Sequence, residues 1–343
     1  MKLDVKRHTL AFARPLQTSY GELTERALLT VSLAGEDGAV GFGEAAPLEP
    51  YDGVSIERTA QALERYAPVL ADSGELNGAQ LIDACRTVDD LPAALAAVDL
   101  ALWDRAGRMR GLPIAELLTD APASHVPVNA TISSLDRASV AEDAARAVSA
   151  GFDCLKLKVA VGDDAGRVAA ARAAAGPEVA LRLDANGGWE VEQAVRAIDA
   201  LAPAGLELVE EPVHGLHGVR EVRERVAVRV SIDETAAEHG ALGAGVADAV
   251  CLKISRCGGI GGLIAAATLV RASGAEPYIA STFDGPLGVA AGVHAAAALA
   301  SRGAVPHCGL ATLSLFAGIE NPLPAHDGRI ALPTNAGLGV EPL

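Results

Sequence analysis

The chain has 343 residues, of which 50% are hydrophobic and 21% are charged. This composition supplies enough apolar material for a large folded core and excludes general disorder. The formal charge of -16 opposes binding to nucleic acid or to an anionic membrane, and the 3% aromatic content leaves few surfaces on which bases could stack. We therefore expect a globular protein with a small-molecule ligand, no nucleic-acid partner and no membrane partner.

The sequence carries no signal for export or membrane insertion. Its N-terminal stretch MKLDVKRHTLAFA alternates polar and apolar residues, and no later run reaches the roughly 18 apolar residues of a membrane span. The five cysteines are scattered and form no CxxC pair, so the sequence indicates neither a disulfide framework nor a zinc knuckle. We expect a cytoplasmic protein.

Residues 1–122 have the pattern of a small α+β domain. Up to about Gly43 the hydrophobic residues alternate with period two, which predicts an antiparallel sheet. After Gly53 they recur at spacings of three and four, as in SIERTAQALERYAPVL, which predicts helices. Breaker residues between Thr119 and His125 end this part of the chain.

From residue 123 onward, short apolar strands alternate with alanine-rich helices. Eight such strands can be counted, beginning with VPVNATIS and CLKLKV and ending with EPYIAST and VPHCGLAT. Strand–helix–strand order predicts parallel strands, and eight units predict an α/β, TIM-like barrel with its reactive groups at the carboxyl ends of the strands. We expect the barrel to span residues 123–320 and the segment 321–343 to pack back on the first domain.

Lysines lie on two of the predicted barrel strands. Lys156 and Lys158 are two residues apart and therefore point to the same face of their strand. A solvated amphipathic strand would show the same pair, so the neighbouring strands must decide between the two interpretations. Lys253 ends the sixth strand, across the barrel from Lys158; as a structural lysine it would pair with Asp233 or Glu234.

Acidic residues end the three strands that follow the lysine pair: Asp184, Glu210 and Asp233. They recur about one strand–helix unit apart, which brings them to the same depth in the barrel. Each alone could be a loop residue or a helix N-cap. Together they would repel one another unless a cation lay among them, and oxygen ligands select Mg²⁺ or Mn²⁺ over zinc. We predict a Mg²⁺ site that Mn²⁺ can also fill.

A metal ion with a lysine on each side suits the removal of a proton next to a carboxylate. The cations stabilise the resulting anion and lower the pKa of a lysine base, which we expect to be Lys158. Other signals are weaker: His307 could line the pocket, and the glycines in residues 258–262 fit an anion cradle or a tight turn equally well. A dinucleotide-binding GxGxxG pattern fails because Ile264 stands at its last position.

The joint pattern resembles the enolase superfamily, and within it the muconate-lactonizing subgroup. The matching motifs are Lys156-x-Lys158, Asp184-x-Asn186, Glu210-x-Pro212, Asp233-Glu234 and Lys253. Gly41-Phe-Gly-Glu-Ala-Ala-Pro47 is similar to a strand and turn of that family's N-terminal capping domain. The resemblance covers essentially the whole chain, and a lysine at position 253, in place of an Asp and His pair, selects the subgroup.

The resemblance implies a (β/α)₇β barrel with an α+β capping domain. It further implies Mg²⁺ held by Asp184, Glu210 and Asp233, with Lys158 as the base, Lys156 modulating it and Lys253 on the opposite face. The implied substrate is a small anionic carboxylate. The residues expected to contact it lie at strand ends or in capping loops: Tyr51, Asp52, Thr131, Asn186, Ser281 and Asp284. Barrels of this type often associate, so a homo-oligomer stays among the expected assemblies.

The same lysines serve dehydration, epimerization and cycloisomerization within the subgroup. The stretch CGLATLSLF at residues 308–316 and the residues around Ser281 and Asp284 resemble the o-succinylbenzoate synthases of menaquinone biosynthesis, which are lyases. Dipeptide epimerases usually carry an Asp-x-Asp pair near the eighth strand, and this chain has none there. The resemblance favours the synthase, with an L-Ala-D/L-Glu-type dipeptide epimerase or a muconate-type cycloisomerase as alternatives.

Two other classes of protein need consideration. A non-catalytic protein could use the same acids to hold a structural ion, but such a site would have no need of the lysines. A metal-dependent aldolase or hydrolase on the same barrel would want a Schiff-base lysine or a histidine-rich site.

Overall fold

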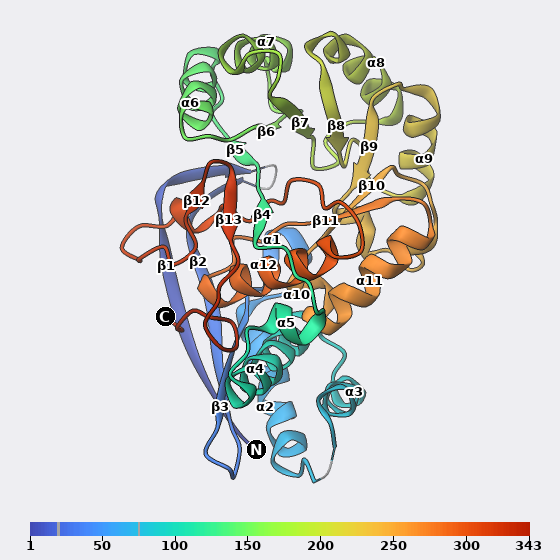
Figure 1. Ribbon diagram of the computed structural model, residues 1–343. Helices are drawn as coiled ribbons and strands as arrows, with labels where there is room; N and C mark the ends of the chain where they lie inside the picture. Colours follow the sequence, from blue (N-terminus) through green and yellow to red (C-terminus); the bar gives the residue numbers. More distant parts are fainter. Residues whose placement is uncertain (19–20, 75) are drawn as a thin grey trace.

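The computed structural model describes residues 1–18, 21–74 and 76–343 (Figure 1). The N-terminal part combines an antiparallel sheet of order β1-β2-β3 with five helices. Its strands are β1 (Lys2–Thr18), β2 (Gly21–Ala34) and β3 (Val40–Ala45). Its helices are α1 (Glu49–Asp52), α2 (Ile56–Ala71), α3 (Gly78–Val88), α4 (Pro92–Arg110) and α5 (Ile114–Leu118).

The N-terminal part has its own hydrophobic core, between the sheet and helices α2 and α4. Leu63, Tyr66 and Leu70 of α2 are fully buried there because they share one face of the helix. Ser55 caps the same helix by accepting a hydrogen bond from the backbone N–H of Arg58. The predicted antiparallel strands and helices therefore form as the hydrophobic periods indicate.

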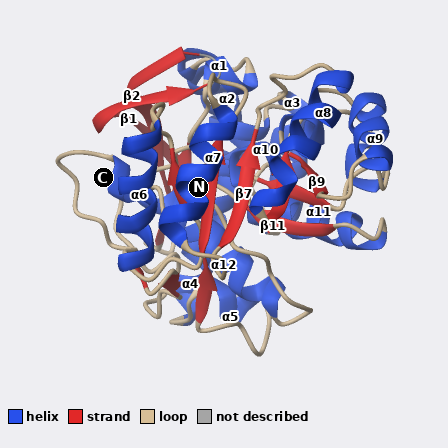
Figure 2. Cartoon of the chain, turned by 90° about the horizontal axis from the view of Figure 1, so that it is seen from above, coloured by secondary structure: helices blue, strands red, loops and turns tan. Residues whose placement is uncertain are grey.

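The second part contains a sheet of seven parallel strands. Figures 1 and 2 show that this sheet is curled and that helices lie outside it. The strands are β5 (Ala130–Ile132), β6 (Cys154–Lys158), β7 (Ala180–Asp184), β8 (Leu206–Glu210), β9 (Arg229–Ile232), β10 (Ala249–Leu252) and β11 (Glu276–Ile279). The helices are α6 (Arg137–Ser149), α7 (Asp164–Ala175), α8 (Val191–Leu201), α9 (Leu216–Arg225), α10 (Ile254–Cys257), α11 (Ile260–Ala272) and α12 (Pro286–Ala300). Four single-turn 3₁₀ helices follow strands or helices: η1 (Ala202–Ala204), η2 (Glu234–Ala237), η3 (Ala241–Gly243) and η4 (Leu313–Leu315).

The eighth predicted strand is much shorter than the sequence suggests. Within residues 305–312, Cys308 forms a parallel bridge with Val128, just before β5, and Gly309 forms one with Ala280, just after β11. This dipeptide therefore joins the two edges of the curled sheet. Pro306 has no N–H to donate to a neighbouring strand, and the chain turns into η4 soon afterwards, so no longer strand develops.

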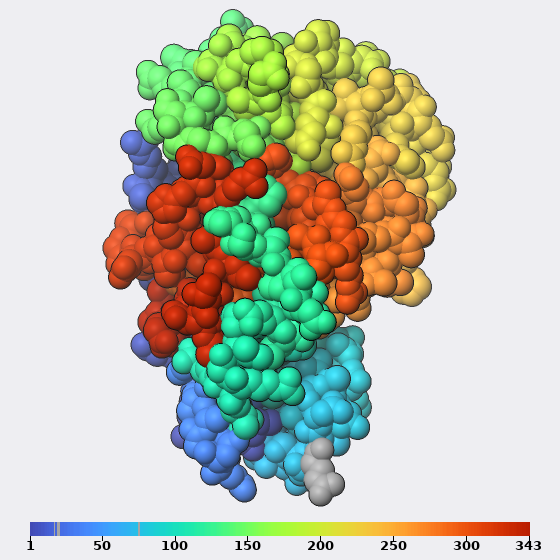
Figure 3. Space-filling model, in the orientation of Figure 1, coloured from blue at the N-terminus to red at the C-terminus, as the bar shows by residue number. Residues whose placement is uncertain are grey.

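The C-terminal segment lies against the region where the two parts of the chain meet (Figure 3). Its strands β12 (Ala325–His326) and β13 (Arg329–Ala331) extend an antiparallel sheet with β4 (His125–Pro127). The backbone N–H of Leu338 donates to Asp104 of α4 at 2.7 Å, and the carbonyl of Gly337 accepts from Ile114 at 3.0 Å. Across the described residues, none of the helices combines the length and apolar character needed to cross a bilayer.

Candidate active site

Strand register brings the predicted lysines and acids to one edge of the parallel sheet. Lys158 pairs with Asp184 across β6 and β7, and Asp184 pairs with Glu210 across β7 and β8. Asp233 directly follows β9, and Lys253 directly follows β10. The five side chains stand at the carboxyl ends of neighbouring strands because parallel strands end at the same edge.

Ion pairs connect these lysines and acids. Lys156 lies 2.9 Å from Asp184 and 2.8 Å from Glu210, and Lys158 lies 2.6 Å from Asp184. Lys253 pairs with both carboxylate oxygens of Asp233. All three carboxylates are buried, so each lysine compensates charge that water does not reach.

Tyr51 connects the N-terminal part of the chain to this network of ion pairs. It lies on α1, and its hydroxyl donates to Asp233 at 2.8 Å while accepting from Lys253 at 2.8 Å. The ammonium of Lys253 also lies 4.3 Å from the centre of the Tyr51 ring, within the range of a cation–π contact. The loop before α2 is thereby fixed to the carboxyl ends of the strands.

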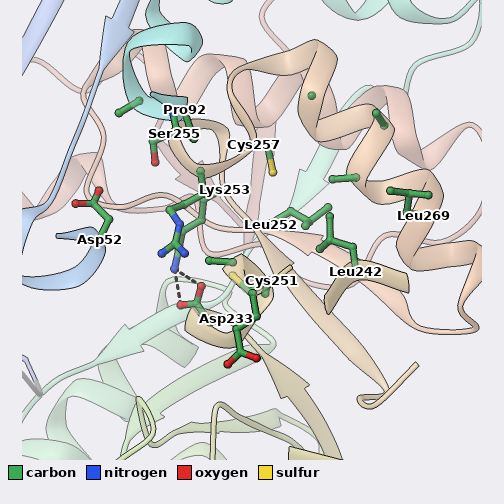
Figure 4. Close-up of a pocket in the computed structure, with 18 of the residues that line it drawn as sticks. Asp52, Pro92, Asp233, Leu242, Cys251, Leu252, Lys253, Ser255, Cys257 and Leu269 are labelled. Carbon is green, nitrogen blue, oxygen red and sulfur yellow. Dashed lines mark hydrogen bonds and ion pairs between the residues drawn. The ribbon is translucent and has the colours of Figure 1, made fainter. Parts of the chain in front are cut away.

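A cavity of about 70 Å³ opens among the lysines. Lys156, Lys158 and Lys253 line it with Asp184 and Asp233, so amines from β6 and from the end of β10 face one space. The wall formed by Tyr51, Asp233 and Lys253 also borders a larger cavity of about 790 Å³ (Figure 4). That larger cavity extends between α4, η2, η3 and α11.

Four of the six predicted substrate-binding residues line the small cavity: Tyr51, Thr131, Asn186 and Ser281. The amide oxygen of Asn186 accepts from Lys158 at 2.6 Å. Asp52 instead accepts hydrogen bonds from the backbone of Leu48 and Val54, and it borders the larger cavity.

Asp284 is buried away from the small cavity and accepts from the hydroxyl of Thr282 at 2.7 Å. Substrate contact by Asp52 or by Asp284 remains a prediction.

The structure adds residues that the sequence patterns did not single out. Tyr278 on β11 donates to Glu210 at 2.7 Å. Glu211 is fully buried and accepts from the backbone N–H groups of Asp233 and Thr235, which fixes the loop after β9. Period-two alternation along β11 could have placed Tyr278 on the inner face, but nothing local distinguishes Glu211 from its neighbour Glu210.

Comparison with known proteins identifies the family. Residues 2–119 match the N-terminal domain of the mandelate racemase/muconate lactonizing enzymes, and residues 139–343 match the enolase C-terminal domain-like family. The chain belongs to the enolase superfamily. The two matches place it with the muconate-lactonizing-like members, and it is an enzyme of that superfamily.

Relatives of this enolase-superfamily chain differ in their reactions. L-Ala-D/L-Glu epimerase of Bacillus subtilis (strain 168) is 29% identical over 99% of this chain and 96% of its own length. The o-succinylbenzoate synthase of Thermobifida fusca (strain YX) is 40% identical, over 59% of this chain and 64% of its own length. A crystal structure of dipeptide epimerase from Enterococcus faecalis V583, complexed with Mg and L-Leu-L-Tyr, has a TM-score of 0.89 at 27% identity and covers 98% of both chains.

Burial and ion pairing shift the pKa values of this superfamily site in opposite directions. Burial alone would raise the pKa of Asp184, but Lys156 and Lys158 outweigh it and hold that pKa below its usual value. Burial alone would lower the pKa of Lys156 and of Lys253, yet the neighbouring carboxylates raise both. Both pKa values are raised because, in the chain by itself, the partners of these two amines are anions.

The donor atoms suit a hard divalent cation. Three buried carboxylates converge at the strand ends, and a fourth acid, Glu234, has a buried oxygen without a partner in the described residues. Burial raises the pKa of Glu234 to about 8, and the negative charge of the nearby Asp233 adds to the shift. A cation would offset the charge of the converging carboxylates, and oxygen ligands are those that Mg²⁺ prefers. That Asp184, Glu210 and Asp233 hold such a cation remains a prediction.

Proposed function

We propose that this enzyme removes the proton next to a carboxylate in a Mg²⁺-dependent reaction, with Mn²⁺ as a substitute, and that the reaction is the dehydration catalysed by an o-succinylbenzoate synthase of menaquinone biosynthesis. One observation carries the chemistry: Lys158 and Lys253, from separate strands, border one cavity together with Asp184 and Asp233. A bound substrate would therefore have an amine on each side of its acidic carbon. When bound by the carboxylates, the cation supplies positive charge next to the substrate carboxylate.

The chain's own residues would divide the proton transfers. Lys158 accepts the proton from the carbon next to the carboxylate of 2-succinyl-6-hydroxy-2,4-cyclohexadiene-1-carboxylate. Lys253 stabilises the developing anion from the other face as an ammonium group, and Lys156 holds Asp184 and Glu210 in place. The protonated Lys158 then returns its proton to the departing hydroxyl on the same face, so water leaves and the ring becomes aromatic.

The segment that joins the sheet edges favours the synthase over a dipeptide epimerase. Gly309 and Thr312 of this segment line the small cavity, and residues 308–312 contain no Asp or Glu. The ammonium group of a dipeptide would find no carboxylate there, whereas the synthase substrate has no ammonium group to bind. The 40% identity to the Thermobifida fusca synthase supports the same choice.

A dipeptide epimerase remains the second candidate because of one specific observation. The likeness to the Bacillus subtilis epimerase extends over 99% of this chain, whereas that to the synthase extends over 59%. Epimerization needs the same pair of lysines, with the second amine returning a proton to the opposite face.

Two parallel assays separate these candidates. Ultraviolet absorbance would follow aromatization of the cyclohexadiene carboxylate with Mg²⁺, and mass spectrometry would follow deuterium entering L-Ala-L-Glu in D₂O. Lys158→Ala should abolish turnover but leave cation affinity nearly unchanged, whereas Lys2→Ala, which removes an exposed lysine paired with Asp4, should leave both unchanged.

Aromatization that is lost in Lys158→Ala would support the synthase. Deuterium in the dipeptide without aromatization would make the protein an epimerase, and turnover that survives in Lys158→Ala would contradict the assignment of the base.

A further inference from the structure

Cys251 stands inside the curled sheet beside two of the proposed metal ligands. It lies on β10 two residues before Lys253, so both side chains point to the inner face of the strand. Its side chain is only 3% exposed and packs with Ala249, Tyr278 and Ala280. The thiol is therefore held at a fixed place, two residues before Lys253 along β10 and so farther from the carboxyl end of the strand.

The thiol faces the carboxylates. Its sulfur and one oxygen each from Glu210 and Asp233 all lie within 4.8 Å of one another, and all three residues are buried. Figure 4 shows the sulfur beside Asp233 and below Lys253. Over residues 1–18, 21–74 and 76–343 the structure gives this sulfur no hydrogen-bond partner. A buried donor atom thus points at two acidic groups without a structural bond of its own.

We propose that Cys251, Glu210 and Asp233 form a mixed sulfur and oxygen site for a thiophilic divalent cation such as Co²⁺, Zn²⁺ or Cd²⁺. The proposal rests on the proposed function only in that Glu210 and Asp233 bind cations. On binding, the S–H bond breaks, the proton passes to solvent and a metal–sulfur bond forms. Mg²⁺ takes oxygen ligands and would leave the sulfur free, so the two kinds of ion would compete for Glu210 and Asp233.

The separations suit one ion after small side-chain movements. Zinc–sulfur bonds are about 2.3 Å and zinc–oxygen bonds about 2.0–2.2 Å, so in tetrahedral geometry a sulfur and an oxygen ligand lie roughly 3.6 Å apart. The three ligand atoms lie within 4.8 Å of one another, so they would have to close by up to about 1 Å around the ion. The cation would compete with Lys253 for the oxygens of Asp233 and with Lys156 for those of Glu210. The 790 Å³ cavity is lined by Cys251 and Asp233, which are two of the three proposed ligands, and by Lys253.

Cobalt reports sulfur ligation directly. The full chain, freed of metal, would be titrated with Co²⁺ while absorbance is recorded in the near-ultraviolet sulfur-to-cobalt band and in the visible cobalt bands. Cys251→Ser is the test variant. Cys257→Ser is the matched control because Cys257 lines the same large cavity but, among the residues that the structure describes, belongs to no such cluster with acids. Circular dichroism would verify that both variants fold.

The wild type and Cys257→Ser should show the sulfur-to-cobalt band, and Cys251→Ser should lack it. Co²⁺ affinity should fall at least tenfold in Cys251→Ser, while Mg²⁺ affinity should change less than twofold. Excess Mg²⁺ should remove the band from the wild type. A band that persists would contradict the claim that the two kinds of ion share Glu210 and Asp233 as ligands.

If Co²⁺ binds but neither the wild type nor either variant shows the band, Cys251 is not a ligand, while the proposed cation site at the carboxylates is still supported. No Co²⁺ binding in any form would overturn both the sulfur ligand and that cation site. If Cys251→Ser does not fold, the cadmium NMR shift of the Cd²⁺-loaded wild type decides between sulfur ligation and oxygen ligation alone.

Discussion

At the scale of single residues, the amino ends of the parallel strands are held by a buried ion pair. Arg182 on β7 is 1% exposed and donates to both carboxylate oxygens of Glu207 on β8, at 2.8 and 3.0 Å. The same guanidinium donates to the backbone carbonyl of His307 at 2.6 Å. This one side chain therefore ties two strands to the segment that joins the sheet edges.

Arg182→Met should lower the free energy of unfolding by roughly 3 kcal/mol, because it leaves Glu207 without its cation partner in a largely buried place. Urea denaturation would measure the change. The control is Arg225→Met, which breaks the exposed pair of Arg225 with Glu192 and should change stability by less than about 1 kcal/mol. Equal losses in the two variants would show that burial does not strengthen the Arg182 pair.

Tyr51 is the residue through which the N-terminal part touches the proposed catalytic groups. Tyr51→Phe removes the hydroxyl that orients Lys253 and Asp233 and keeps the ring that covers them. Loss of such hydrogen bonds is worth about 1–3 kcal/mol, so kcat with the proposed substrate should fall about tenfold.

Tyr66→Phe is the control for Tyr51→Phe. It removes a hydroxyl that donates to the backbone of Asp89 in the core of the N-terminal part, and Tyr66 does not line the small cavity, so the change should lower stability but not kcat. Unchanged kcat in Tyr51→Phe would exclude a positioning role for its hydroxyl.

At the scale of elements, the glycines before Glu44 have a steric origin. Gly41 and Gly43 lie on β3 where α4 crosses it, and a Cβ on either would overlap a backbone carbonyl oxygen of α4, from Ala101 and Ala97 respectively. The GxGE motif that indicated the family is thus a contact between a strand and a helix backbone. It positions Glu44 at the end of that strand without itself taking part in chemistry.

Gly43→Ala should therefore lower the free energy of unfolding by about 1–3 kcal/mol, since the strand and helix must move apart to admit one methyl group. Gly78→Ala is its control. A Cβ at Gly78, the first residue of α3, would meet only a side-chain carbon of Leu102 at 4.0 Å, so the stability should change by less than about 1 kcal/mol. Thermal unfolding of both variants tests the prediction, which fails if Gly43→Ala melts with the wild type.

Elements whose signal is local could be predicted from the sequence, and those fixed by distant partners could not. Strands β6 to β10 are short, largely apolar runs that end in a polar residue or are directly followed by one, and each lies where its run predicts. The run around Cys308 looks like an eighth strand of the same kind, but only its bridges to Val128 and Ala280 form. The hydrophobic pattern of a segment does not reveal how many backbone N–H and C=O groups at the edges of the sheet are free to pair with it.

At the scale of the whole molecule, some residues of the site could be predicted from local sequence signals, and others are placed there by contacts between distant parts of the chain. Lys158, Asp184 and Glu210 come together because parallel register forces them to, and spacing along the chain is enough to predict that. The bond from Tyr51 to Asp233 joins residues far apart in sequence, so it depends on how the N-terminal part packs against the sheet. The interior position of Asp284 depends on the same packing, through its neighbour Glu44.

Glu44 links the two parts of the chain and should make stability depend on pH. It accepts from the backbone N–H of Gly285, just before α12, at 2.7 Å, and its other oxygen has no partner in the described residues. Burial and then the nearby Asp284 raise the pKa of Glu44 from 4.5 to about 8. The folded protein therefore keeps a proton on Glu44 that the unfolded chain releases above pH 4.5.

This difference fixes the direction of the pH effect. Below pH 4.5 both states hold the proton and the contribution of Glu44 to stability is complete; as the pH rises toward 8 the contribution is lost, by as much as about 4–5 kcal/mol. Glu44→Gln keeps an oxygen acceptor for Gly285 but cannot ionise, so it should flatten the decline. Urea denaturation at several pH values between 5 and 8 would compare it with the wild type and with Glu64→Gln, which alters an exposed residue of α2. A decline of the same size in Glu44→Gln would assign the effect to another buried acid, such as Asp99, whose pKa burial raises to about 6.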